Sequence, residues 1–419
     1  MTEREAVRAP APSGVKWMLA ATLVSGVAGY LVTFFAYQAL AGAGYVVFAA
    51  FWSALFLVVG VLFGLQQEST RATAEALRDA DRPGRRQSSL WIFGAGAGLI
   101  VGAIVLVSSV LWAPDSLGQE NTGLALQVAL GSAANAVVAT MSGALAGSQR
   151  WRLLAAVIFL DGILRLAAVS LVLSVSDDLN LLAWAVVLPF PLAIGTVFCF
   201  APGVLRRLGH SPLRYRTLAV NSVHTVIAAS ATAILINGFP LVLAFYGQGS
   251  DKDVLADLMF AIMLTRAPIL VPLMALQSYL VTRFTNDRAA LWAFLLKAIG
   301  AVAAVMALLG AATWLWGLWA FQTFINESFT LPTAALVPLV VSSGFIGILC
   351  VTGPALLALG RHRAYAAGWV AASAVALAVL FVPIPIEFRA PLALSLGPVV
   401  GIIWHLLAIR QGLRAQRRP

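Results

Sequence analysis

Charged residues are scarce in this chain of 419 residues. They make up 11% of the sequence, whereas hydrophobic residues make up 61%, and a soluble domain carries roughly 25% charged residues. So few charges cannot cover a water-facing surface, which excludes a soluble globular protein. Cysteine and histidine are also sparse, with two and four copies. These numbers and their spacing exclude a disulfide framework and make a metal site of the usual Cys/His type implausible.

Motifs of catalysis and nucleotide binding are absent as well. No glycine-rich loop ends in Gly-Lys-Ser/Thr, and the sequence holds neither a His-Glu-x-x-His motif nor a Ser/His/Asp set. We therefore predict no enzyme and no cofactor. The largest loop is the basic stretch 68–89, so the chain lacks the large external loops that are typical of membrane glycosyltransferases.

Long apolar stretches are what the sequence has in abundance. A transmembrane helix needs about 20 mainly apolar residues, and we count twelve such stretches. The first is too long for a signal peptide, whose apolar region spans roughly 7–15 residues. We predict an all-α integral membrane protein with spans at 16–37, 45–66, 90–111, 123–148, 151–175, 181–200, 217–246, 255–283, 290–316, 333–359, 365–385 and 391–409.

Basic residues gather in alternate loops. Most of the 27 Lys and Arg residues lie at the two termini or in the loops that follow the even-numbered spans, whereas the other loops hold mainly acids. Basic loops mark the cytoplasmic side. We therefore predict that both termini are cytoplasmic and that the protein lies in a bacterial cytoplasmic membrane. The net charge of +10 is then an insertion signal, which excludes nucleic acid as a partner.

Two local matches, each offset by six spans, relate the halves of the chain. Segment 144–150 resembles segment 357–363, because both carry Gly three residues before Arg, and segment 65–71 resembles segment 276–283. These repeats predict two six-helix lobes of the same orientation, related by an axis along the membrane normal. The predicted parts are a polar N-terminus (1–15), an N-terminal lobe (16–200), a basic linker (201–216), a C-terminal lobe (217–409) and a basic tail (410–419).

Ionisable side chains inside the spans mark functional sites by default, because they are costly in lipid. Asp161 is the acid placed most clearly inside a span, and Arg165 lies on the same helical face four residues later. A buried structural pair and a coupling pair are both open. Arg266 lies mid-span with no acid three or four residues away. Its bidentate fork suits phosphate, so we predict a substrate-binding residue; an ion pair with a distant helix, or snorkelling, is the alternative.

Other polar residues lie at or near the ends of the spans. Lys297 is a second predicted phosphate ligand, although a lysine near a helix end also snorkels to the headgroups. The predicted cavity or gate residues are Glu68, Arg71, Gln66, Gln277 and Asn237. For Glu68 and Arg71 the alternative is a solvated face at the membrane edge. For Asn237 it is a hydrogen bond between helices.

Four segments carry a family resemblance. They are Phe-Gly-Leu-Gln-Gln-Glu-Ser-Thr-Arg at 63–71, Asp-Gly-Ile-Leu-Arg at 161–165, Asn-Gly-Phe-Pro at 237–240, and Leu-Thr-Arg-Ala-Pro at 264–268 with Ala-Leu-Gln at 275–277. In order and spacing they resemble actinobacterial polysaccharide-biosynthesis membrane proteins. That family belongs with the O-antigen-type flippases in the multidrug/oligosaccharidyl-lipid/polysaccharide (MOP) exporter superfamily.

The resemblance implies two six-helix lobes, arranged as in the MATE multidrug exporters, around a cationic cavity. It also implies alternating-access transport of a polyprenyl-(pyro)phosphate-linked glycan to the outer leaflet, for cell-envelope polysaccharide synthesis. The implied partners are this substrate, membrane lipids, and glycosyltransferases or a polymerase of the same pathway. Two alternatives stay open. A cation-coupled multidrug exporter should carry more acids within its spans, and a non-transporting scaffold would recruit cell-wall enzymes through the basic loop 68–89.

Overall fold

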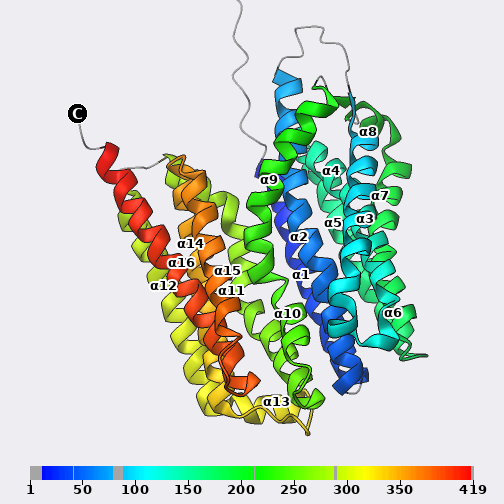
Figure 1. Cartoon of the computed structure of the whole chain (residues 1–419). Coiled ribbons are helices and arrows are strands. Elements are labelled where there is room, and N and C mark those ends of the chain that lie inside the picture. Colours follow the sequence, from blue (N-terminus) through cyan, green and yellow to red (C-terminus); the bar gives the residue numbers. More distant parts are fainter. Residues whose placement is uncertain are drawn as a thin grey trace, which may run out of the picture. The chain divides into compact units, whose positions relative to one another are not determined.

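Almost every described residue of the computed structural model lies in a helix (Figure 1). The structure describes residues 12–40, 42–78, 88–208, 210–211, 213–286 and 290–416. The helices are α1 (Pro12–Ala39), α2 (Gly42–Arg78), α3 (Leu90–Leu117), α4 (Leu124–Gly147), α5 (Trp151–Leu173), α6 (Leu179–Val187), α7 (Pro189–Phe200), α8 (Pro202–Leu208), α9 (Tyr215–Ile236), α10 (Phe239–Tyr246), α11 (Lys252–Asn286), α12 (Leu291–Ala312), α13 (Leu318–Phe324), α14 (Thr333–Ala358), α15 (His362–Val379) and α16 (Ile386–Gln416).

Short elements complete the described chain. A 3₁₀ turn covers Gln119–Asn121, and a π-helical turn at Thr313–Gly317 joins α12 to α13. Strands β1 (Ser88–Ser89) and β2 (His210–Ser211) pair antiparallel, with Ser88 opposite Ser211. This two-residue ladder ties the segment before α3 to the segment after α8.

Ten helical segments of the described chain are long and apolar enough to cross a bilayer. They confirm the predicted all-α, multi-pass membrane protein. Helices α11 and α15 occupy the two remaining predicted spans but are not among the ten. The count of twelve spans and the cytoplasmic termini therefore stay predictions.

Several predicted spans have different boundaries in the structure. Helix α2 continues to Arg78, because charged residues at i,i+3 and i,i+4 spacing support it beyond the apolar run. The predicted basic loop 68–89 therefore begins as helix, and its residues 79–87 lie outside the described residues. The spans 181–200 and 217–246 each divide in two. In both, the second half-helix begins with proline in its first turn, at Pro189 and Pro240, where the missing N–H is tolerated.

The chain divides into two compact units. The first contains Met1–Val32, Val58–Val110 and Gly123–Ala229, and the second contains Thr33–Leu57, Leu111–Thr122 and Ser230–Pro419. Helices α2 and α9 thus contribute residues to both units. The lobe boundaries drawn from the sequence repeats stay a prediction.

Glycines allow close helix contacts in the first unit. A Cβ added at Gly98 of α3 would lie 2.5 Å from the carbonyl oxygen of Ala133 in α4. One added at Gly64 of α2 would lie 2.5 Å from the backbone of Thr225 in α9. A real Cβ cannot approach backbone so closely, so both helix pairs depend on the missing side chain.

Helix α14 is the most buried helix of the second unit and packs against α11, α12 and α16. His405 of α16 is fully buried and contacts α14 and α15. Its Nδ1 lies 2.8 Å from the Thr352 hydroxyl, and its Nε2 lies 3.1 Å from the Tyr365 carbonyl oxygen. These bonds satisfy a polar ring inside an apolar core.

Cysteine labelling will test the predicted orientation. In a chain without Cys199 and Cys350, we expect single cysteines at Gln119 and Ser328 to react with an impermeant thiol reagent added outside intact cells. Cysteines at Arg214 and His362 should react only after the membrane is opened. All four positions are exposed, so burial does not mask them. Labelling of either predicted cytoplasmic site in intact cells would contradict the topology.

Candidate functional site

The break between α9 and α10 in the second unit is held by a serine from α2. Helix α9 ends at Ile236, and α10 begins at Phe239. The Ser53 hydroxyl donates to the Asn237 carbonyl at 2.5 Å and accepts the Leu241 N–H at 3.0 Å. One side chain therefore satisfies backbone groups on both sides of the break. Non-helical backbone at membrane depth requires such partners, since lipid offers none.

Arg266 binds the same break from α11. It is 4% exposed, and its Nη1 donates to the Ile236 carbonyl oxygen at 2.7 Å. Its guanidinium carbon lies 6.0 Å from the centre of the Phe239 ring. A cation at a helix C-terminus is stabilised by the helix dipole. A backbone carbonyl from another helix is thus one partner of Arg266, which its sequence neighbours do not reveal.

Arg165 occupies an equivalent place in the first unit. Its Nε donates to the Val186 carbonyl at 3.1 Å, in the last turn of α6, and its guanidinium lies 4.7 Å from the Phe190 ring in α7. Its Nη1 and Nη2 donate to Asp161 at 2.9 and 2.5 Å. Each unit therefore uses a buried arginine to bind the C-terminal carbonyls of a broken helix. At Arg165 a carboxylate also balances the charge.

Glu68 and Arg71, for which a solvated face was an open alternative, form an ion pair in which Glu68 is buried and Arg71 is exposed. Glu68 is 2% exposed, so that alternative is wrong for it. Arg71 donates to its two carboxylate oxygens at 2.8 and 2.6 Å and also pairs with Glu75. Asn221 of α9 donates to Glu68 at 3.0 Å. We call the Glu68–Asn221 contact the first latch. It joins α2 to α9 beside the close contact at Gly64.

The other candidate residues are spread over several helices. Lys297 is exposed and lies two residues after Leu295, on the side of α12 that faces away from its buried contacts. Asn237 lies at the break itself and is half-buried. Gln66 is half-buried on α2, one turn before Thr70. Gln277 lies on α11, and its side chain falls outside the described residues.

Asp257 is a buried acid that the sequence interpretation missed. It is 5% exposed on α11 and accepts hydrogen bonds from the Tyr37 hydroxyl and, at 2.7 Å, from the Thr330 N–H and hydroxyl. Tyr37 stacks on Phe260 with ring centres 4.2 Å apart. We call the Tyr37–Asp257–Thr330 contact the second latch. Its signal was available, because Asp257 lies inside the predicted span 255–283. Asp257 is more deeply buried than Asp161, which is half-buried.

No group of three or more His, Cys, Asp or Glu side chains that would suit a metal ion occurs among the described residues. The clusters described above consist of arginines on carbonyls and of carboxylates with donors. Such arrangements hold helices together and balance charge.

The comparisons with known proteins identify relatives of unknown activity. No family profile matches the chain. It is 32% identical over 397 residues to the uncharacterised protein Rv3630 of Mycobacterium tuberculosis, with 93% of this chain and 90% of the relative covered. It is 31% identical over 429 residues to the uncharacterised protein Rv1510 of the same species, with 98% and 95% covered. The chain belongs to the family of these mycobacterial proteins.

Solved structures show which fold this family has. The lipid II flippase MurJ in an inward closed conformation superimposes with a TM-score of 0.71 at 14% identity, covering 95% of this chain and 89% of that one. An inward-facing MATE multidrug transporter of the MOP superfamily gives 0.70 at 14% identity, covering 96% and 100%. The chain thus has the fold of MOP-superfamily transporters. The narrower assignment to O-antigen-type flippases stays a prediction.

The buried Asp161–Arg165 pair makes a stability prediction. Asp161→Asn leaves the guanidinium of Arg165 without its carboxylate. We therefore expect the free energy of unfolding to fall by on the order of 3 kcal/mol. The double variant Asp161→Leu with Arg165→Met should be less destabilised than the single variant, because no buried charge remains. Thermal unfolding in detergent will compare them. A single variant as stable as the natural chain would contradict a structural pair.

Proposed function

We propose that the protein is a transporter that flips a polyprenyl-(pyro)phosphate-linked glycan from the inner to the outer leaflet of the bacterial cytoplasmic membrane. The observation that carries this proposal is a buried arginine at a helix break within a MOP-transporter fold. The glycan would serve cell-envelope polysaccharide synthesis, with glycosyltransferases or a polymerase of the same pathway as partners. The lipid chains would stay in the bilayer while the polar head crosses.

Arg266 suits a phosphate because a guanidinium is a permanent cation whose fork of N–H groups matches phosphate oxygens. Its Nη1 donates to the Ile236 carbonyl, which holds the guanidinium at the break. Discontinuous helices form the substrate sites of many transporters. The first turn of α10, beside Arg266, adds the positive end of a helix dipole. We assign the phosphate to this place; Lys297, which is exposed on the opposite side of α12 from its buried residues, is not part of this assignment.

A multidrug exporter gains some support from the buried acids. That alternative requires carboxylates within the helices for a cationic substrate, and Glu68 and Asp257 are both buried. However, Glu68 accepts from Arg71 and Asn221, and Asp257 accepts from Tyr37 and Thr330. Both carboxylates are thus already engaged by donors of the protein. We therefore place the glycan flippase first and keep the exporter as the second candidate.

The two latches fit alternating access. The first latch joins α2 to the beginning of α9, near the predicted cytoplasmic ends of both helices. The second joins α1, α11 and the segment before α14, near the predicted external face. Each contact connects residues of the predicted N- and C-terminal lobes. A substrate path between lobes must open at one face and then at the other, so each latch would have to part in turn.

A series of substitutions at Arg266 will test the phosphate assignment. Arg266→Gln keeps a donor for the Ile236 carbonyl but loses the charge, whereas Arg266→Lys keeps the charge but loses the fork. We expect translocation of a fluorescent polyprenyl-pyrophosphate-linked sugar in proteoliposomes to fall in the order natural chain, Lys, Gln, with Gln at least about tenfold slower. All variants are compared at equal amounts of folded protein.

Arg165 provides the matched control, since it binds a helix break in the same way. The double variant Asp161→Leu with Arg165→Met should keep the flipping rate per folded protein. If Arg266→Gln flips at the natural rate, the arginine only holds the break and the phosphate assignment fails. Efflux of cationic dyes without glycan flipping would select the multidrug exporter.

Crosslinking will test the latches. In the cysteine-free chain, we pair Glu68→Cys with Asn221→Cys at the first latch. Beside the second latch we pair Gln38→Cys with Ile325→Cys, because the Gln38 side chain donates to the Ile325 carbonyl in the natural chain. A short bifunctional thiol reagent should stop flipping in each pair, and cleaving the linker should restore it. Each single cysteine is the control for modification alone. Full transport by either crosslinked pair would show that its contact need not part.

A further inference from the structure

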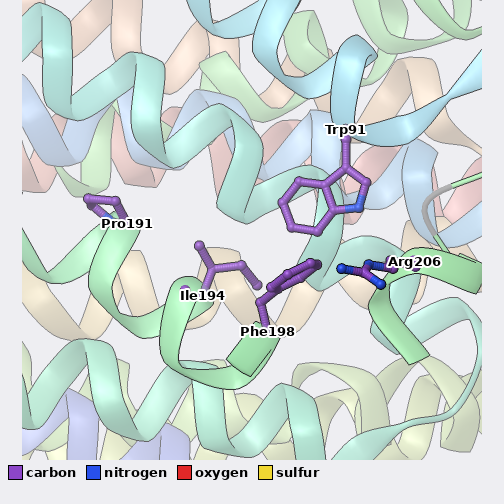
Figure 2. Close-up of a pocket in the computed structure, with 6 residues that line it drawn as sticks. Trp91, Pro191, Ile194, Phe198 and Arg206 are labelled. Atoms are coloured by element: carbon purple, nitrogen blue, oxygen red, sulfur yellow. The ribbon is translucent and has the colours of Figure 1, made fainter. Parts of the chain in front are cut away.

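An apolar pocket of about 410 Å³ lies in the first unit, apart from every residue assigned above. Its lining comes from α3, α7 and α8 and consists of Trp91, Pro191, Ile194, Gly195, Phe198 and Arg206. Figure 2 shows Pro191, Ile194 and Phe198 along one side of α7, with Trp91 and Arg206 converging on Phe198. The walls are apolar, and the guanidinium stands at one end.

The aromatic end of the pocket is well defined. Trp91 meets Phe198 edge to face with ring centres 5.8 Å apart, and the Arg206 guanidinium carbon lies 5.7 Å from the Phe198 ring centre. The β1–β2 ladder lies close to both Trp91 and Arg206 in the chain. Trp91 follows β1 by two residues, and Arg206 precedes β2 by four. The Ser88 hydroxyl strengthens that connection by donating to the Leu213 carbonyl at 2.8 Å.

Gly195 keeps the middle of the pocket open. A Cβ added there would meet no atom within 4 Å. Beside the pocket, α7 presents the exposed side chains of Leu192 and Phe200, which are 52% and 86% exposed. An apolar surface of this kind on a membrane protein faces acyl chains. The pocket therefore opens beside lipid, and a pocket of roughly 300–1,000 Å³ suits a small ligand.

We propose that this pocket binds an anionic glycerophospholipid of the cytoplasmic leaflet. One acyl chain lies between Trp91 and α7 over Gly195, and the phosphate binds the N–H edge of Arg206. Stacking on Phe198 uses the face of the guanidinium, which directs its donors sideways. Arg206 lies in the basic linker predicted to be cytoplasmic, and the anionic lipids of that leaflet attract such basic pockets. The charge of the pocket mouth thus matches this occupant.

Lipid titrations of the purified full-length protein will test the site. We expect dioleoylphosphatidylglycerol, added to protein in detergent, to raise the melting temperature saturably, and dioleoylphosphatidylcholine to do so far less. Arg206→Gln should weaken the apparent affinity at least about tenfold. Gly195→Phe should fill the pocket and abolish the shift. Its own melting temperature without lipid should not fall, because the added ring enters open space.

Arg410 supplies the control for charge alone. It is exposed and also lies over an aromatic ring, 5.2 Å from that of Trp292, so Arg410→Gln should leave the affinity unchanged. An equal loss in Arg410→Gln would mean general attraction between charges and would overturn the site. So would an undiminished shift in Gly195→Phe, or a shift with inorganic phosphate alone. Displacement of phosphatidylglycerol by a lower concentration of polyprenyl phosphate would assign the pocket to substrate instead.

Discussion

The hydrocarbon interior of a bilayer offers no hydrogen-bond partner to a backbone carbonyl, so every interruption of a membrane helix must be satisfied by the protein itself. Two predicted spans of this chain are interrupted, between α6 and α7 and between α9 and α10. At each interruption a buried arginine donates to a backbone carbonyl. Arg165 donates to Val186, and Arg266 donates to Ile236. Placing an arginine inside lipid is itself costly, and that cost is offset because each cation meets the negative end of a helix dipole.

The two arginines have different partners at the helix breaks, and the proposed function starts from Arg266. Asp161 lies one turn before Arg165 and binds it through both carboxylate oxygens, so the pair is close to neutral. Arg266 donates to a backbone carbonyl, which orients its guanidinium at the break. Under the proposed function, the phosphate of the substrate binds this oriented guanidinium.

Hydropathy predicted the fold class well, because it depends on averages over about 20 residues. Sequence patterns failed at single residues whose partners come from distant helices. Ile236 lies thirty residues before Arg266 in the chain, and Tyr37 lies even farther from Asp257, so no spacing rule finds either contact. The predicted end of the second span, at residue 66, is wrong for another reason. Hydropathy falls after Gln66, but the ion pairs of Arg71 with Glu68 and Glu75 continue the helix.

Under the proposed alternating access, the parting of each latch must be coupled to another event. Parting Glu68 from Asn221, or Asp257 from Tyr37 and Thr330, removes hydrogen bonds from a buried carboxylate. A buried polar group that loses its partner costs about 1–3 kcal/mol, and more when it is charged. Water, a proton or a substrate group must therefore replace the lost donors as each latch parts.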